Sequence, residues 1–298
     1  MTGLDHTARV VLSGCALIGL LGGVLGVFVV LRRQSLVGDV VSHAALPGIV
    51  LAFWLLGSRA APVLAAGAIV AGLAGMLVVT FILRHSHIRE DGALGLVLAG
   101  FFGLGVMLLT WIQGRPDAAQ AGLDRYLFGS AASLLVRDLW WMGGAALAVV
   151  GVLVLLWKVF ALTAFDPDFA AQLGWPTVRL DFILTLLTVL VIVLGLQTVG
   201  VVLMSALLVA PAVAARQWTD RLGAMTLLAA LAGALAGLLG GWASLTVERM
   251  PTGPAIVLAA ALLVALSLLA SPRRGLLGVL LARRRARRGG EALPAGRA

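Results

Sequence analysis

Two ionisable side chains stand four residues apart in an otherwise apolar stretch, LVGDVVSHAALPG (residues 36–48). In a helix, positions i and i+4 lie on one face, so the carboxylate of Asp39 and the imidazole of His43 can reach the same point. A carboxylate oxygen and an imidazole nitrogen suit Zn²⁺, Mn²⁺ or Fe²⁺ as ligands. The spacing therefore indicates either a metal-binding pair or a structural pair that only ties helices together, and both interpretations stay open here.

A second group of candidate ligands lies in the segment RHSHIRED (84–91). His85 and His87 form an H-x-H pattern, and Glu90 and Asp91 follow directly. A path by which a metal leaves the protein is the weaker interpretation of this group. A solvated basic loop explains the histidines, and carboxylates at the start of the next helix explain the two acids.

The elements that must position these side chains are membrane helices. Of the 298 residues, 61% are hydrophobic and 12% are charged, and the mean hydropathy is +1.07. Apolar windows of about 18 or more residues recur along the chain, and each must form a helix to satisfy its own backbone in hydrocarbon. The windows lack the alternation of a membrane β-barrel. We therefore expect an all-α, polytopic integral membrane protein with eight or nine transmembrane helices.

The apolar windows predict spans at 9–31, 38–57, 61–83, 91–112, 139–162, 179–197, 199–215, 222–246 and 253–270. The pair at 179–215 is interrupted by glycines and Gln197, so it is either two spans or one broken element. Together the spans form one transmembrane domain, residues 1–275. A basic tail, 276–298, follows and is expected to be disordered in the cytoplasm, where anionic membrane lipid explains its arginines.

The distribution of basic residues predicts the orientation and excludes some functions. More Arg and Lys fall in the connections that face inward if the N-terminus faces outward, which places the C-terminus in the cytoplasm. Lys158, the only lysine, follows Trp157, so the chain has no Gly-Lys-Ser/Thr loop for ATP. Cys15 is the only cysteine, which excludes a disulfide within the chain. No nucleic-acid-binding domain is indicated.

Two connections are longer than hairpins require. The second half of 113–138 is amphipathic, which is typical of a re-entrant or interfacial helix. The other, FDPDFAAQLGWPTVR (165–179), begins with the helix-start signal Asp166-Pro167 and ends at Gly174 and Pro176. Between these signals lie the apolar residues Phe169, Ala170 and Leu173. This pattern predicts one short cytoplasmic helix across the membrane face.

Four separated segments resemble one known family in the same order: the permease subunits of bacterial ABC importers for zinc, manganese and iron(II). They are LRRQSLVGDVVSHAALPGI, LDRYLFGS, FDPDFAAQLGWP and VGVVLMSALLVAPAVAARQW. The similarity covers about residues 10–270. Agreement across four motifs is much more specific than any one of them.

The resemblance implies roles for particular residues. Asp39 and His43 match the family's metal-pathway pair. The family's ATPase-docking helix matches Asp166, Pro167, Asp168, Phe169, Ala170, Leu173, Gly174 and Pro176. Family members work as homodimers with two ATP-binding subunits on the cytoplasmic side and an extracytoplasmic metal-binding protein. Some zinc-importing relatives carry a further His in the fourth span, where this chain has Ala99, Gly100 and Phe101, so the remaining ligands and the metal stay undecided.

The expected function is therefore transport without bond chemistry in this chain. We expect a multi-pass protein of the bacterial cytoplasmic membrane that moves zinc, or secondly manganese, inward by alternating access, with iron(II) a further possibility. It would hold no permanently bound cofactor, since the metal is cargo. The alternatives are a permease for vitamin B12 or an iron–siderophore, and a gradient-driven secondary transporter. An intramembrane metalloprotease would need His-Glu-x-x-His, which the sequence lacks.

Overall fold

The computed structural model describes residues 6–58, 60–113, 134–196, 198–247 and 250–271, and every regular element within these ranges is a helix. Eight helices are long and apolar enough to cross a membrane, and a shorter apolar helix covers 203–216. The expected all-α polytopic architecture is confirmed. The helices are α1 (His6–Leu31), α2 (Val37–Leu56), α3 (Ala61–His85), α4 (Glu90–Gln113), α6 (Val136–Leu155), α7 (Trp157–Phe165), α8 (Pro167–Gln172), α9 (Thr177–Leu196), α10 (Val201–Arg216), α11 (Leu222–Thr246) and α12 (Thr252–Ala270).

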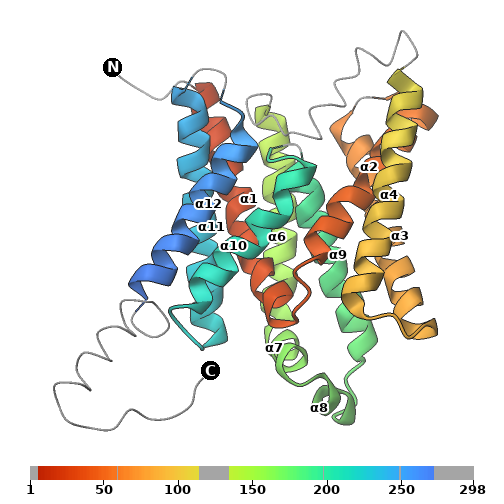
Figure 1. Ribbon diagram of the computed structural model, residues 1–298. Coiled ribbons are helices and arrows are strands. Elements are labelled where there is room, and N and C mark those ends of the chain that lie inside the picture. Colours follow the sequence, from red (N-terminus) through yellow and green to blue (C-terminus); the bar gives the residue numbers. More distant parts are fainter. Residues whose placement is uncertain (1–5, 59, 114–133, 197, 248–249, 272–298) are drawn as a thin grey trace, which may run out of the picture.

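Helix α1 stands near the middle of the bundle (Figure 1). It packs on α10 and α11, while α2 packs on α3 and α4, and α9 and α10 contact both α1 and α2. The short helices α7 and α8 project at the lower end in this view. The turn between α1 and α2 and the connection between α3 and α4 lie toward that same end. Both carry basic residues, Arg32 and Arg33 in the first and Arg89 in the second.

Glycines let α1 and α11 approach until their backbones touch. A Cβ added at Gly19 would collide with the carbonyl oxygen of Gly233, and one at Gly237 with that of Cys15. Small residues at four-residue spacing allow this approach in membranes, where packing replaces the hydrophobic effect between helices. The glycine-rich segment 231–241 thus serves close helix packing.

The turn between α1 and α2 ends α1 in a defined way. The N–H of Gln34 donates to the carbonyl of Val29 at 3.0 Å, and the N–H of Arg33 donates to that of Val30 at 3.1 Å. This is a Schellman motif, with the left-handed position occupied by Arg33 (φ +60°) instead of glycine. The chain then enters α2 at Val37, so Asp39 and His43 lie in the first two turns of that helix.

One predicted span is interrupted in the structure. The single span 139–162 is divided into α6 and α7 at Leu156, whose ψ is +11°. No glycine or proline marks this break. Tertiary packing accounts for it: Trp157 and Phe160 both meet Phe28 of α1 edge to face, with centroids 5.8 and 6.1 Å apart.

The predicted pair at 179–215 forms two separate helices, α9 and α10, joined through Gly200 (φ +92°). α10 is shorter than a full span. The amphipathic part of 113–138 and the tail 276–298 lie outside the described residues, apart from 113 and 134–138.

Candidate functional site

Asp39 and His43 lie one turn apart near the start of α2, both only partly buried. Asp39 is in the first turn of the helix, where the unpaired N–H groups and the helix dipole favour a carboxylate. The predicted common face is therefore present. It is not sealed by the rest of this chain.

His43 has an unused ligand atom. Its Nδ1 is buried and has no hydrogen-bond partner among the described residues. The ring stands edge-on to Phe102 of α4, with centroids 4.8 Å apart and planes at 74°. No hydrogen bond joins Asp39 to His43 in the described ranges, and both side chains belong to one helix. A hydrogen-bonded lock between two helices therefore does not explain the pair.

The backbone around His43 is also unusual. Proline has no N–H, so Pro47 leaves the carbonyl of His43, four residues earlier, without its helical donor. Gly48 follows and crosses Gly67 of α3 so closely that a Cβ on either would strike the other's carbonyl oxygen. Gly38 packs against Ser205 of α10, 3.1 Å from the place of its missing Cβ. Small residues thus bring α3 and α10 against the helix that carries the pair.

The face of the pair continues into an exposed apolar groove between α2 and α4. The groove holds about 420 Å³, and Trp54 meets Trp111 edge to face across it, with centroids 5.6 Å apart. Its lining residues are Leu51, Trp54, Met107, Leu108, Trp111 and Ile112. Within the described part of the chain, no three His, Cys, Asp or Glu residues gather closely enough to hold a metal ion. A metal ion held by the pair would therefore need further ligands from elsewhere.

The predicted exit residues do not form a metal site among the described residues. His85 stacks on Phe81 (centroids 4.4 Å, planes 26°), and its Nδ1 lies 3.0 Å from the Phe81 carbonyl. His87 is exposed, and Glu90 and Asp91 occupy the first turn of α4, as the capping interpretation expects. Their role in metal exit stays a prediction.

The predicted cytoplasmic helix is present as α8, and it is only six residues long. The carboxylate of Asp166 accepts the N–H of Phe169 at 2.9 Å and so caps its start. Gly174 (φ +82°) ends it, with Trp175 donating to the Ala170 carbonyl at 3.1 Å. Ala170 is buried. Pro167 is the first residue of the helix, and Pro176 directly precedes α9. Three large apolar side chains stay exposed: Phe169 (47%), Leu173 (56%) and Trp175 (45%).

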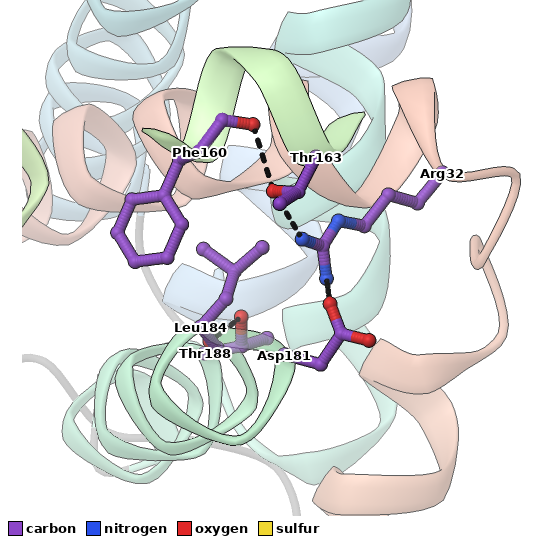
Figure 2. A network of polar contacts seen from close by, with 6 residues as sticks. All are labelled: Arg32, Phe160, Thr163, Asp181, Leu184 and Thr188. Atoms are coloured by element: carbon purple, nitrogen blue, oxygen red, sulfur yellow. Dashed lines mark hydrogen bonds and ion pairs between the residues drawn. The ribbon is translucent and has the colours of Figure 1, made fainter. Parts of the chain in front are cut away.

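A polar network that the sequence analysis missed lies where α1, α7 and α9 meet (Figure 2). Arg32 Nη1 lies 2.8 Å from Asp181 Oδ1, and Arg32 Nη2 donates to Thr163 Oγ1 at 3.2 Å. The Thr163 hydroxyl in turn donates to the Phe160 carbonyl at 3.2 Å. Arg32 is more than 130 residues from Thr163 and from Asp181 in the sequence, so no local spacing could reveal these contacts. The one available signal was Asp181, an acid directly inside a predicted span.

Comparisons with known proteins agree with this picture. The model of the ABC 3 transport family matches residues 5–271. The chain is 48% identical over 282 residues to the zinc transport system membrane protein TroC of Treponema pallidum, covering 94% of each protein. It is 45% identical over 266 residues to the manganese transport system membrane protein MntC of Bacillus subtilis, covering 89% of this chain and 61% of that one. A solved structure, PsaBC from Streptococcus pneumoniae in complex with Fab, superposes with a TM-score of 0.81 at 30% identity, over 92% of this chain and 95% of that one.

Proposed function

The chain belongs to the ABC 3 transport family, and from that premise we propose that it is the permease subunit that carries a divalent transition metal into the bacterial cytoplasm. Transport would proceed by alternating access and be driven by ATP hydrolysed on a partner chain. This chain would itself catalyse no reaction and keep no resident cofactor, because the metal is cargo.

The unused Nδ1 of His43 beside the Asp39 carboxylate is the observation that carries this proposal. An ionised Asp inside a membrane helix costs about 2.5–3.5 kcal/mol on insertion scales. A dication held by both side chains would offset that cost. With only two protein ligands on one chain, the site would bind weakly, which suits a site that must release its cargo.

The partly exposed position of the pair supports a second copy of the chain as partner. A carboxylate facing lipid is unfavourable, so we infer that the face formed by α2 and α4 is covered by protein. The apolar groove beside the pair would then belong to the same covered face. A second copy would bring another Asp39 and His43, and the missing ligands could come from that side.

Docking of an ATP-binding subunit on α8 is supported by the exposed apolar side chains at its surface. Three such side chains, one on α8 and two in the turn that follows it, are unfavourable in water, and a partner protein would bury them. We propose one ATP-binding subunit for each copy, on the cytoplasmic side. An extracytoplasmic metal-binding protein would deliver the ion at the opposite end.

Zinc is the first choice of cargo and manganese the second. Imidazole suits Zn²⁺ and Fe²⁺, while carboxylate suits Mn²⁺, so the visible ligands do not separate them. The two relatives named above are a zinc and a manganese transport protein. The slightly higher identity to the zinc protein favours zinc.

The proposal is tested by metal uptake in bacteria that lack their own zinc and manganese importers. Cells would receive this chain with an ATPase subunit and a binding protein from its own organism, and accumulation of radioactive zinc and manganese would be measured. Uptake above that of cells lacking this chain is expected. Equal uptake in both would contradict the proposal. Uptake that is indifferent to Asp39→Asn combined with His43→Ala would favour a permease for a larger chelate.

A further inference from the structure

The docking helix α8 is held between two helices that share one cation. Thr163 of α7 lies three residues before Asp166, the residue that caps α8, and Asp181 of α9 lies five residues after Pro176. Arg32 contacts both: its two terminal nitrogens reach Thr163 Oγ1 at 3.2 Å and Asp181 Oδ1 at 2.8 Å (Figure 2). A displacement of α8 would therefore pull on both sides of this contact.

The same arginine belongs to the segment that carries the metal pair. Arg32 directly follows α1 and precedes Asp39 by seven residues, across the Schellman turn. Backbone hydrogen bonds tie this turn at both ends: Gln34 donates to Val29, and Val37 donates to the Gln34 carbonyl at 3.0 Å. A shift of the Arg32 side chain is thus transmitted through a short, hydrogen-bonded stretch to the first turn of α2.

Unsatisfied polar atoms mark the segment from Arg32 to His43. Among the described residues, the buried side-chain atoms that lack a hydrogen-bond partner are Arg32 Nε, Ser42 Oγ and His43 Nδ1, and all three belong to it. Buried polar groups are nearly always paired in folded proteins. Their concentration in one stretch indicates that this stretch makes additional contacts in another state of the transport cycle.

We propose that Arg32 is a positioning residue that links the position of α8 to the position of Asp39 and His43. This inference rests on the function proposed above. In the observed state, the contacts of Arg32 with Asp181 and Thr163, here termed the Arg32 latch, hold the start of α2 in place. Movement of α8 with the ATPase breaks the latch, releases the segment 32–43 and changes the environment of the metal pair.

The exposure of the latch suits a contact that opens in each cycle. The Arg32 side chain is only 12% exposed, so it stays anchored among the helices, whereas the Asp181 side chain is 59% exposed. Solvent weakens an ion pair with one exposed partner, so the contact can be broken without a large cost. A cavity of about 330 Å³ adjoins both residues and is also lined by Glu90 and Arg84, so it holds both a second carboxylate and a second cation.

The first test measures zinc transported per ATP hydrolysed by the full complex in vesicles. We expect Asp181→Asn and Thr163→Val to keep ATP hydrolysis while the zinc-to-ATP ratio falls about fivefold, at the lower end of coupling between distant sites. Arg32→Asp combined with Asp181→Arg reverses both charges of the ion pair. This double variant should have a higher zinc-to-ATP ratio than Asp181→Asn. The controls are Thr185→Val, on the same cavity without a latch contact, and Arg33→Asn, which removes the neighbouring charge.

Each outcome of this test has one meaning. If wild-type complex transports zinc and the latch variants keep its zinc-to-ATP ratio, the latch is wrong and the proposed function stands. If the wild type moves neither zinc nor manganese, the proposed function itself fails. If the controls lower the ratio as much as the latch variants do, the effect is not specific to the latch, and the inference is overturned.

A second test asks whether the latch must open. Arg32→Cys combined with Asp181→Cys can be bridged by a short reducible thiol cross-linker, and the native Cys15 is fully buried and does not compete. The bridge is expected to stop zinc transport, and its reduction to restore transport to the level of the unbridged double variant. Unchanged transport with the bridge in place would overturn the inference.

Discussion

The imidazole of His43 stands edge-on to the ring of Phe102, with centroids 4.8 Å apart and ring planes at 74°. This contact joins α2, which carries the proposed ligands, to α4, which carries none. It limits rotation of the imidazole about its side-chain bonds and leaves Nδ1 without a protein partner. In the proposed site, Phe102 would therefore help to orient the nitrogen that His43 offers to a metal.

Phe102→Ala should weaken metal capture while leaving the fold intact. Aromatic pairs contribute about 0.5–1.5 kcal/mol beyond burial, so the half-saturating metal concentration for uptake should rise about threefold to tenfold. Uptake at several metal concentrations measures this change. Leu104→Ala, another exposed α4 position, serves as control and should leave the concentration dependence unaltered. An identical response of the two variants would rule out a special role for Phe102.

Asp39→Asn and His43→Gln should each reduce uptake at limiting metal by at least about tenfold, since even residues that only support metal ligands cost about 10–100-fold in affinity. Leu55→Ala provides the control on the same helix, because Leu55 is exposed and lies outside both the pair and the groove. The amount of each variant in the membrane is measured alongside. Wild-type uptake by Asp39→Asn would remove the basis of the proposed site.

Local signals predicted those parts of the fold whose boundaries are determined locally. Asp166-Pro167 and Gly174 delimit α8 because a cap and a left-handed residue act within one turn. The break at Leu156 has no such signal, since it depends on Phe28, more than a hundred residues earlier. Likewise, the i and i+4 spacing predicted the common face of Asp39 and His43, whereas Phe102 and the Arg32 latch arise only from the packing of distant helices.

Asp166→Ala should impair ATPase docking by loosening the start of α8. Loss of a capping side chain costs about 1 kcal/mol, and a helix of six residues has few other bonds to compensate. Less ATPase should copurify with this variant in detergent. Asp168→Ala changes an acid in the same segment whose side chain, among the described residues, caps no backbone N–H, and it should retain more of the partner. Equal loss of the ATPase from both variants would show that the negative charge matters for docking and the helix cap does not.

Gly19→Val should destabilise the bundle, because the added side chain meets the backbone of Gly233 on α11. Overpacking costs about 1–3 kcal/mol, and a collision with backbone cannot be relieved by a rotamer change. The melting temperature of the detergent-solubilised protein should fall. Gly151→Val is the matched control, since nothing lies within 4 Å of the Cβ position there. Similar melting temperatures for both variants would contradict the close contact.

Pro47→Ala should restore the missing helical hydrogen bond to the His43 carbonyl and stiffen α2. We expect a more stable protein with slower maximal uptake, because the helix can no longer bend at this residue. Melting temperature and uptake at saturating metal measure the two effects separately. The control is Leu55→Ala, at an exposed position of the same helix outside the groove. A Pro47→Ala variant with faster maximal uptake would contradict the proposed bending of α2 at Pro47.

The cluster of unsatisfied atoms between Arg32 and His43 also has a consequence for the resting protein. Hydrocarbon cannot pair with these atoms, so in the absence of metal, water has to reach them. The start of α2 should therefore be hydrated even though the helix lies within the bilayer, and its amide protons should exchange faster than those of α1. An arriving metal ion would then exchange its hydration shell for a site that already contains water.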